Sequence, residues 1–306
     1  MEYLLEDKIH VGISACMYGA KIRYNAKGWN MPANLNRERS DFYWTPVCPE
    51  VMAGMGVPRT PIRLQGGNGH DFWEEKAIIK NRKGQEVSEQ LRFGAETCMG
   101  TLDRAGVEAF VFMEGSPSCG VYRTTLKNDR LGKPPGVFGS LLLKEKLFLI
   151  PAVDLQSPVK WWDWRRRLVA FVWLRRLEVK SPKTLSETWH GLKFLCQEIE
   201  QNRARELGRE ISALSNKSTP EEIESLKSEI LFLLRKPSNV ERIKQSLWKS
   251  YSFLRKKSGL VVEEVNEPLA LRNMTSLAKE LISMEKEAKL GGHHFGASPV
   301  VYRPGR

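Results

Sequence analysis

The first half of the chain alternates two hydrophobic patterns. Compact apolar runs of strand length begin at residues 10 (HVGISAC), 107 (VEAFVFM) and 146 (KLFLIPAVDL). Between them, residues 88–106 place four apolar residues, Cys98 among them, on one face at helical spacing. Buried strands that alternate with helices are typical of a parallel sheet covered by helices. We therefore predict an α/β domain with a mostly parallel, Rossmann-like sheet.

The second half of the chain has a helical pattern. A segment containing WWDWRRRLVAFVWLRRLEVK precedes it, and every later periodic segment has helical spacing. Helix starts are indicated at Thr184, Thr219 and Ser238, by capping-box spacing or by a following proline. Gly259 and Gly291 occupy positions typical of helix ends. We predict an all-α domain here.

The domain organisation follows from these patterns and from the length. A chain of 306 residues with 41% hydrophobic and 27% charged residues is typical of two soluble domains. We predict a first domain at 1–158, a linker at 159–182 and a helical domain at 183–306. No apolar run approaches the roughly 18 residues of a spanning helix, and MEYLLEDKIH does not resemble a signal peptide. We expect a cytoplasmic protein that does not enter the membrane.

Positive charge is concentrated in the second half. The formal net charge is +12, and residues 161–306 hold 27 Lys and Arg against 18 Asp and Glu. Residues 1–160 are nearly balanced, with 21 against 18. This distribution predicts a polyanionic partner for the helical domain, although a solvated basic surface has the same composition.

Three of the five cysteines share a sequence context. Cys16, Cys48 and Cys119 lie in SAC, PVCPE and SPSCG, at predicted strand ends or in loops of small residues. Because the carboxyl ends of parallel strands meet at one sheet edge, these thiols can converge there as ligands of a metal centre. Three inert core thiols or a zinc site are the alternatives. Cys98 and Cys196 lie on apolar helix faces, and we expect both in a core.

The strings around these cysteines resemble a known family. SACMYGAKIRY, PVCPEVMAGMGVPR, GGNGHDF, SPSCG and GVFGSLLL occur in the order found in thiouracil desulfidases, over about residues 8–155. The resemblance implies a 4Fe-4S cluster bound by Cys16, Cys48 and Cys119, with one iron free for the sulfur of the substrate. One position departs from the family pattern, because Asn25 follows Arg23 and Tyr24 where an aspartate is usual.

The second half also has a resemblance. RARELGREIS and LLRKPSNVERIKQSLWKSYSFLRKK, within about residues 183–266, resemble a helical domain often fused behind desulfidase domains. The two-domain arrangement is similar to tRNA 4-thiouridine desulfidases. This resemblance implies that tRNA is the partner and a thiolated uracil base the substrate. The reaction would convert 4-thiouridine to uridine and release hydrogen sulfide without net electron transfer.

Two residues near the predicted ligands are candidates for catalysis. Glu50 lies two residues after Cys48, where a carboxyl group in apolar surroundings is suited to general acid–base work. Its structural alternative is the capping of a helix that begins at Pro49. Ser116 can orient water or the base by hydrogen bonding, or it can be an ordinary turn hydroxyl.

RNA binding requires several cations that reach phosphates together. The candidates in the second half are Arg165, Arg166, Arg203, Arg205, Arg209, Lys236 and Lys244. Two other functions fit the same sequence. One is a desulfidase for free 2-thiouracil or another small thiolated metabolite, whose helical domain serves oligomerisation. The other is a non-enzymatic, RNA-binding iron–sulfur sensor.

Overall fold

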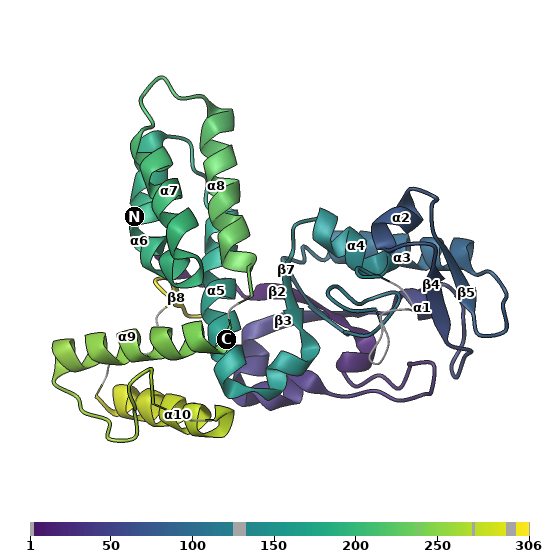
Figure 1. The fold of residues 1–306 in the computed structure, drawn as a ribbon, viewed down its shortest axis with the longest axis horizontal. Coiled ribbons are helices and arrows are strands. Elements are labelled where there is room, and N and C mark those ends of the chain that lie inside the picture. The colour runs from purple at the N-terminus through teal and green to yellow at the C-terminus, as the bar shows by residue number, and fades with distance from the viewer. Residues whose placement is uncertain (1–2, 125–132, 238, 271–272, 292–297, 306) are drawn as a thin grey trace. The chain divides into compact units, whose positions relative to one another are not determined.

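The chain forms two units in a computed structural model that describes residues 3–124, 133–237, 239–270, 273–291 and 298–305. The α/β unit comprises Lys8–Gln156, drawn in purple to teal in Figure 1. The helical unit comprises Met1–Asp7 and Ser157–Arg306. In the described ranges no helix is long and apolar enough to cross a membrane.

A four-stranded parallel sheet forms the centre of the α/β unit. Its strands lie in the order β3-β2-β6-β7. Their bounds are β2 Ile9–Ser14, β3 Phe42–Val47, β6 Ala109–Phe112 and β7 Phe148–Pro151. The two central strands are almost wholly buried, which explains why their sequences are continuous apolar runs. The predicted parallel α/β domain is confirmed, and each of the three predicted runs contains a strand.

Helices and a small hairpin complete the α/β unit. The helices are α1 Pro49–Met52, α2 Gly69–Trp73, α3 Ser88–Arg104 and α4 Val137–Lys144. The described residues of this unit also form the 3-10 helices η1 Ala15–Met17, η2 Met31–Asp41 and η4 Ala152–Gln156. Strands β4 Ile62–Gln65 and β5 Ile78–Asn81 pair antiparallel. The predicted helix at 88–106 is α3, and its apolar face packs into the core, where Cys98 is fully buried.

The helical unit contains six helices in its described part. They are α5 Pro158–Arg176, α6 Pro182–Ile199, α7 Gln201–Ser212, α8 Pro220–Arg235, α9 Val240–Ser258 and α10 Met274–Leu290. Strand β1 (Leu4–Leu5) pairs in parallel with β8 (Val301–Tyr302). This pairing explains why the first residues of the chain belong to the helical unit rather than to the sheet that follows them.

Some helix ends lie where the sequence predicts them, and others lie at neighbouring residues. Thr219 forms the capping box of α8, and Gly259 ends α9 in the left-handed conformation at φ 71°. The start predicted at Thr184 lies earlier, because Ser181 caps α6 and Pro182 occupies the first turn. Ser238 lies outside the described residues, and the N-cap of α9 is Asn239.

The segment predicted as a linker, residues 159–182, is instead largely helix α5. Most of this helix is buried, including both positively and negatively charged residues. Asp163 accepts hydrogen bonds from Arg166 at 2.9 Å and from Arg167 at 2.7 Å. A helix that is buried all round has no polar face, so its sequence lacks the amphipathic period by which the later helices were predicted.

Candidate functional site

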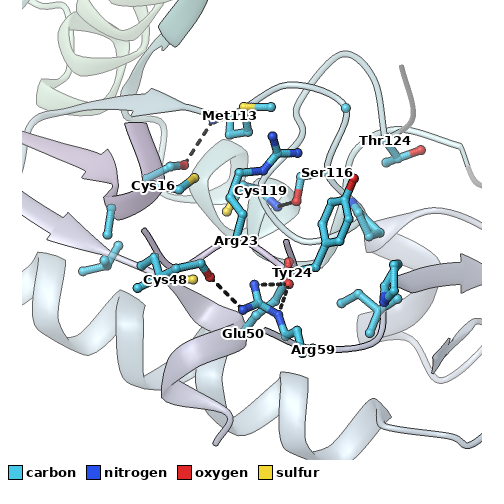
Figure 2. A pocket seen from close by; sticks show the side chains of 18 residues that line it. Cys16, Arg23, Tyr24, Cys48, Glu50, Arg59, Met113, Ser116, Cys119 and Thr124 are labelled. Atoms are coloured by element: carbon cyan, nitrogen blue, oxygen red, sulfur yellow. Dashed lines mark hydrogen bonds and ion pairs between the residues drawn. The ribbon is translucent and has the colours of Figure 1, made fainter. Parts of the chain in front are cut away.

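Three thiols line one cavity at the carboxyl edge of the sheet (Figure 2). Cys16 lies in η1 directly after β2, Cys48 follows β3, and Cys119 lies in the loop after β6. These strands are neighbours in the sheet, so their carboxyl ends bring the thiols together. The cavity has a volume of about 390 Å³. Within the described chain, no three His, Cys, Asp or Glu side chains are placed to share a single metal ion.

The loop that carries Cys119 is held by the N-terminus of α4. The amide of Val137 donates to the carbonyl of Pro117 at 3.0 Å, and that of Phe138 donates to Ser118 at 2.9 Å. The first amides of a helix have no partner within the helix, and here the loop carbonyls satisfy them. The string GVFGSLLL therefore contributes to the site by positioning this loop.

The string GGNGHDF has a structural role. The side chain of Asn68 accepts hydrogen bonds from the amides of His70 and Asp71, while Asp71 accepts one from the amide of Asn68 at 2.7 Å. This arrangement is a capping box that begins α2. None of these residues lines the cavity among those described.

Glu50 lines the cavity, and both of its carboxylate oxygens are hydrogen bonded. Oε2 accepts from Nε and Nη2 of Arg59, at 2.7 and 2.5 Å. Oε1 accepts from the hydroxyl of Ser118 at 2.7 Å. Arg59 also donates to the carbonyl of Ile22 at 2.7 Å, which ties the loop after η1 to the same network. Glu50 thus lies in the first turn of α1, but these bonds orient its carboxylate toward the site.

The hydroxyl groups of Ser116 and Ser118 connect the SPSCG loop to Glu50. Ser116 lines the cavity, and its oxygen lies 3.0 Å from the hydroxyl oxygen of Ser118. It also accepts a hydrogen bond from the amide of Cys119 at 3.1 Å, as a turn hydroxyl does. Ser118 and Arg59 were not among the predicted site residues. Both lie within the strings that carry the resemblance, SPSCG and PVCPEVMAGMGVPR.

Burial raises the pKa values of the three thiols, and neighbouring acidic groups add to the increase. Burial raises the pKa of Cys16 to about 12, with a further contribution from Cys48. Burial also raises the pKa of Cys119, followed by the effects of Cys48 and Cys16, while a hydrogen bond from Ser14 acts in the opposite direction. For Cys48, burial again dominates and the Glu50 carboxylate adds to it. Thiolates at these positions require a compensating positive charge.

The other two cysteines lie in cores, as predicted. Cys98 and Cys196 are both fully buried on helices. Burial raises the pKa of each to about 12. The Cys48 thiol adds to the increase at Cys98 and a hydrogen bond with the Cys48 backbone opposes it, but Cys98 does not line the cavity.

The position where the family usually has aspartate lies in a surface turn. The side chain of Asn25 accepts a hydrogen bond from the amide of Lys27 at 3.3 Å. Its neighbours Arg23 and Tyr24 line the cavity. The Arg23 guanidinium lies 4.9 Å from the ring centre of Trp29 and 5.5 Å from that of Tyr24.

The candidate RNA contacts fall into two groups. Arg205 and Arg209 on α7 are exposed and join no ion pair in the described part of the chain. The remaining candidates are engaged with other side chains of the helical unit. Arg165 lies over the ring of Tyr302, and ion pairs are formed by Arg203, Lys236 and Lys244.

Arg166 does not fit the predicted RNA contact. Its side chain is 4% exposed, and Asp163 and Glu198 hold its guanidinium at 2.9 and 2.8 Å. A guanidinium with this burial cannot approach a phosphate group. Arg166 therefore serves the packing of α5 against α6.

Comparison with known proteins identifies the class of the α/β unit. Residues 11–153 match the family model described as 2-thiouracil desulfurase. The uncharacterized protein YbbK of Bacillus subtilis (strain 168) is 30% identical over 134 residues, which cover 42% of this chain and 87% of that protein. The chain belongs to the 2-thiouracil desulfurase family, whose members are enzymes that cleave a carbon–sulfur bond.

A solved structure is also similar to this chain. It is that of the 4Fe-4S-dependent thiouracil desulfidase TudS, with 27% sequence identity and a TM-score of 0.40. The match covers 49% of this chain and 93% of that one. The family model ends at residue 153, so it does not extend into the helical unit.

Proposed function

We propose that this protein is an iron–sulfur-dependent desulfidase whose substrate is 4-thiouridine in tRNA. The observation that carries the proposal is the convergence of Cys16, Cys48 and Cys119 on a cavity that also contains Glu50. Family membership supports desulfuration as the reaction.

The donor set fits a 4Fe-4S cluster. Three thiols from three strand ends surround a cavity that lies within the roughly 300–1,000 Å³ range of small-molecule and cofactor sites. When bound, such a cluster with three protein thiolates would supply an iron with an open position, a Lewis acid with affinity for sulfur. The dependence of TudS on a 4Fe-4S cluster supports the same assignment.

The residues around the cavity can supply the proton transfers. Replacing the thiocarbonyl sulfur by oxygen consumes one water and releases hydrogen sulfide, so no electrons are exchanged. The Glu50 carboxylate accepts a proton from the attacking water and returns it to the departing sulfur. Arg59 and Ser118 hold the carboxylate in one orientation, which reduces the reorganisation needed for transfer. Ser116, which lines the cavity, orients the water or the base.

The charge of the helical unit supports tRNA as the carrier of the thiolated base. Residues 161–306 hold 27 Lys and Arg against 18 Asp and Glu. Arg205 and Arg209 lie one turn apart on the exposed face of α7, where both can approach phosphates. An alternative substrate is free 2-thiouracil, which the description of the family itself favours.

Anaerobic reconstitution tests the proposal and separates the two substrates. The full chain is loaded with iron and sulfide, then incubated with tRNA that contains 4-thiouridine or with free 2-thiouracil. Nucleosides and bases are quantified by mass spectrometry. We expect loss of 4-thiouridine with an equal gain of uridine, and no loss with the Cys16→Ala variant. Turnover of 2-thiouracil alone would favour the small-molecule substrate, and turnover of neither would contradict the proposed function.

A further inference from the structure

A cavity of about 480 Å³ lies between α6 and α9 of the helical unit. Two phenylalanines line it, Phe194 from α6 and Phe253 from α9. Their exposed fractions are 65% and 68%, although phenylalanine is usually buried. We call this cavity the Phe194–Phe253 groove. Exposed aromatic rings on both of its helices offer flat surfaces on which a planar ligand can stack.

Polar groups accompany the rings in this groove. The amide of Gln197 and the hydroxyl of Ser250 line it and can donate or accept hydrogen bonds. The ion pair between Arg166 and Glu198 also contributes to the lining and is held in place by burial. Such a mixture differs from a membrane-binding surface, which requires a continuous apolar face. It matches the edge of a nucleobase, which carries both donors and acceptors.

The groove has positive charge at its edges. Lys249 is exposed and lines it, and the ammonium of Lys193 lies 5.1 Å from the ring centre of Phe194. Lys256 is exposed on the same face of α9, one turn beyond Phe253. On α6, Glu187 is an exposed acidic residue two turns before Phe194. Cations therefore outnumber free carboxylates around the rings, which favours an anionic ligand.

A second hollow adjoins the groove through Gln197, which lines both. It contains Arg205 and Arg209 of α7 together with Trp189 of α6. The two arginines are exposed and lie one turn apart. Aromatic rings next to a track of cations are the arrangement by which proteins bind single-stranded nucleic acid.

We propose that the Phe194–Phe253 groove binds an unpaired base of an RNA. The base stacks on the phenylalanine rings and meets Gln197 and Ser250 with its edge. Its phosphate lies near Lys249, and a neighbouring phosphate lies near Arg205 or Arg209. The assignment rests on the proposed function in one respect, since tRNA is the RNA that would supply the unpaired nucleotides.

Binding of unmodified RNA tests the groove without depending on catalysis. A labelled 12-nucleotide oligouridylate and a duplex RNA of equal length are titrated with the full chain, and anisotropy is measured. Phe194→Ala and Phe253→Ala should each weaken single-strand binding by about 5- to 150-fold, which corresponds to ~1–3 kcal/mol per stacked base. Duplex binding should change less. Phe93→Ala on α3 removes an equally exposed ring, at 63%, and should leave RNA binding unchanged.

Further measurements keep the result unambiguous. Phe194→Leu retains apolar area but lacks an aromatic ring, so it should also weaken binding. It separates the loss of stacking from any effect of Phe194→Ala on folding. Photocrosslinking of an oligonucleotide with 5-iodouridine should label Phe194 or Phe253. Unchanged affinity in the Phe variants, crosslinks confined to other elements, or preferential binding of peptides or lipid vesicles would overturn the assignment. Turnover of free 2-thiouracil and of tRNA by wild-type protein is recorded separately, so failure of the proposed function shows independently of RNA binding.

Discussion

The two units of this chain differ in whether their buried ionisable groups have partners of opposite charge. In the α/β unit, Cys16, Cys48 and Cys119 face a shared cavity, and burial, followed by the proximity of the other thiols, raises the pKa values of Cys16 and Cys119. In the helical unit, the buried carboxylate of Asp163 is enclosed by arginines. Burial alone would raise the pKa of Asp163, but Arg167 and Arg166 outweigh it and lower the pKa. Three thiols that share one cavity indicate a place for a ligand, whereas a buried carboxylate enclosed by arginines within a packed helix indicates a structural role.

The largest effect is expected when the cysteine thiols are removed one at a time. Cys16→Ala, Cys48→Ala and Cys119→Ala should each abolish iron–sulfur absorbance and desulfuration, because each removes one of the three proposed ligands. Cys98→Ala and Cys196→Ala are matched controls that remove fully buried thiols outside the cavity, and they should retain the cluster. Iron content and visible absorbance after anaerobic purification provide the measurement. Full iron content in Cys48→Ala would contradict the proposal that Cys48 is a ligand of the cluster.

Replacing the carboxylate of the site should come next in effect. Glu50→Gln should keep the cluster and lower kcat by about 10²- to 10⁴-fold, the usual contribution of general acid–base catalysis. Glu74→Gln is the control, since Glu74 is an exposed carboxylate of the same unit. Single-turnover rates are normalised to cluster content. Near-normal turnover of the cluster-replete variant would remove Glu50 from the mechanism.

The compensated charge of the helical unit should affect stability. Asp163→Asn leaves two buried arginines without their carboxylate and should lower the free energy of unfolding by ~3–5 kcal/mol at pH 7. Because the pKa of Asp163 is lowered from its ordinary 3.8, the ion pairs stabilise the fold above pH 3.8, and this contribution is lost as the pH falls below that value. Urea unfolding at pH 7 and pH 3 measures the difference.

Surface pairs provide the control for that measurement. Glu206→Gln removes a half-exposed partner of Arg203 and should cost less than ~1 kcal/mol. The difference between wild type and Asp163→Asn should shrink at low pH, whereas the difference for Glu206→Gln stays small throughout. Equal effects of the two variants would contradict the structural role assigned to Asp163.

The hydroxyl that holds Glu50 should have a smaller effect on catalysis. Ser118→Ala removes the donor to Oε1 of Glu50 and should lower kcat by about tenfold, since a hydrogen bond to a charged group contributes ~1.5 kcal/mol at the low end of its range. KM should change little, because Ser118 does not line the cavity. Steady-state kinetics on the substrate found active resolve the two parameters. Ser40→Ala, which alters an exposed hydroxyl, should match wild type.

The smallest expected effect concerns the exposed arginines. Arg205→Gln combined with Arg209→Gln should reduce the slope of log affinity for tRNA against log salt by about 0.7–0.9 per lost phosphate contact. Arg203→Gln is the matched control on the same helix, because its guanidinium already pairs with Glu210 at 2.7 Å. Binding isotherms at several salt concentrations give the slopes. If only Arg203→Gln changed the slope, the expectation that arginines outside ion pairs are the ones that contact RNA would be wrong.

Local patterns were sufficient for several features of this chain. Apolar runs of strand length identified β2, β6 and β7, because central strands of a parallel sheet are buried on both faces. Helical spacing identified α3 and separated Cys98 from the cysteines in loops. The recurring strings around Cys16, Cys48 and Cys119 selected the thiols that the structure places around one cavity.

Tertiary structure alone decided which distant residues meet. The strand order β3-β2-β6-β7 makes the three thiols neighbours, and strand order depends on contacts between segments far apart in sequence. The bonds from Arg59 and Ser118 to Glu50 join segments 9 and 68 residues apart, which no periodicity encodes. For the same reason, the sequence did not distinguish Arg166 from Arg209. Arg166 is buried and pairs with Glu198 of another helix, whereas Arg209 is exposed to solvent, and the residues next to each in the sequence do not reveal this difference.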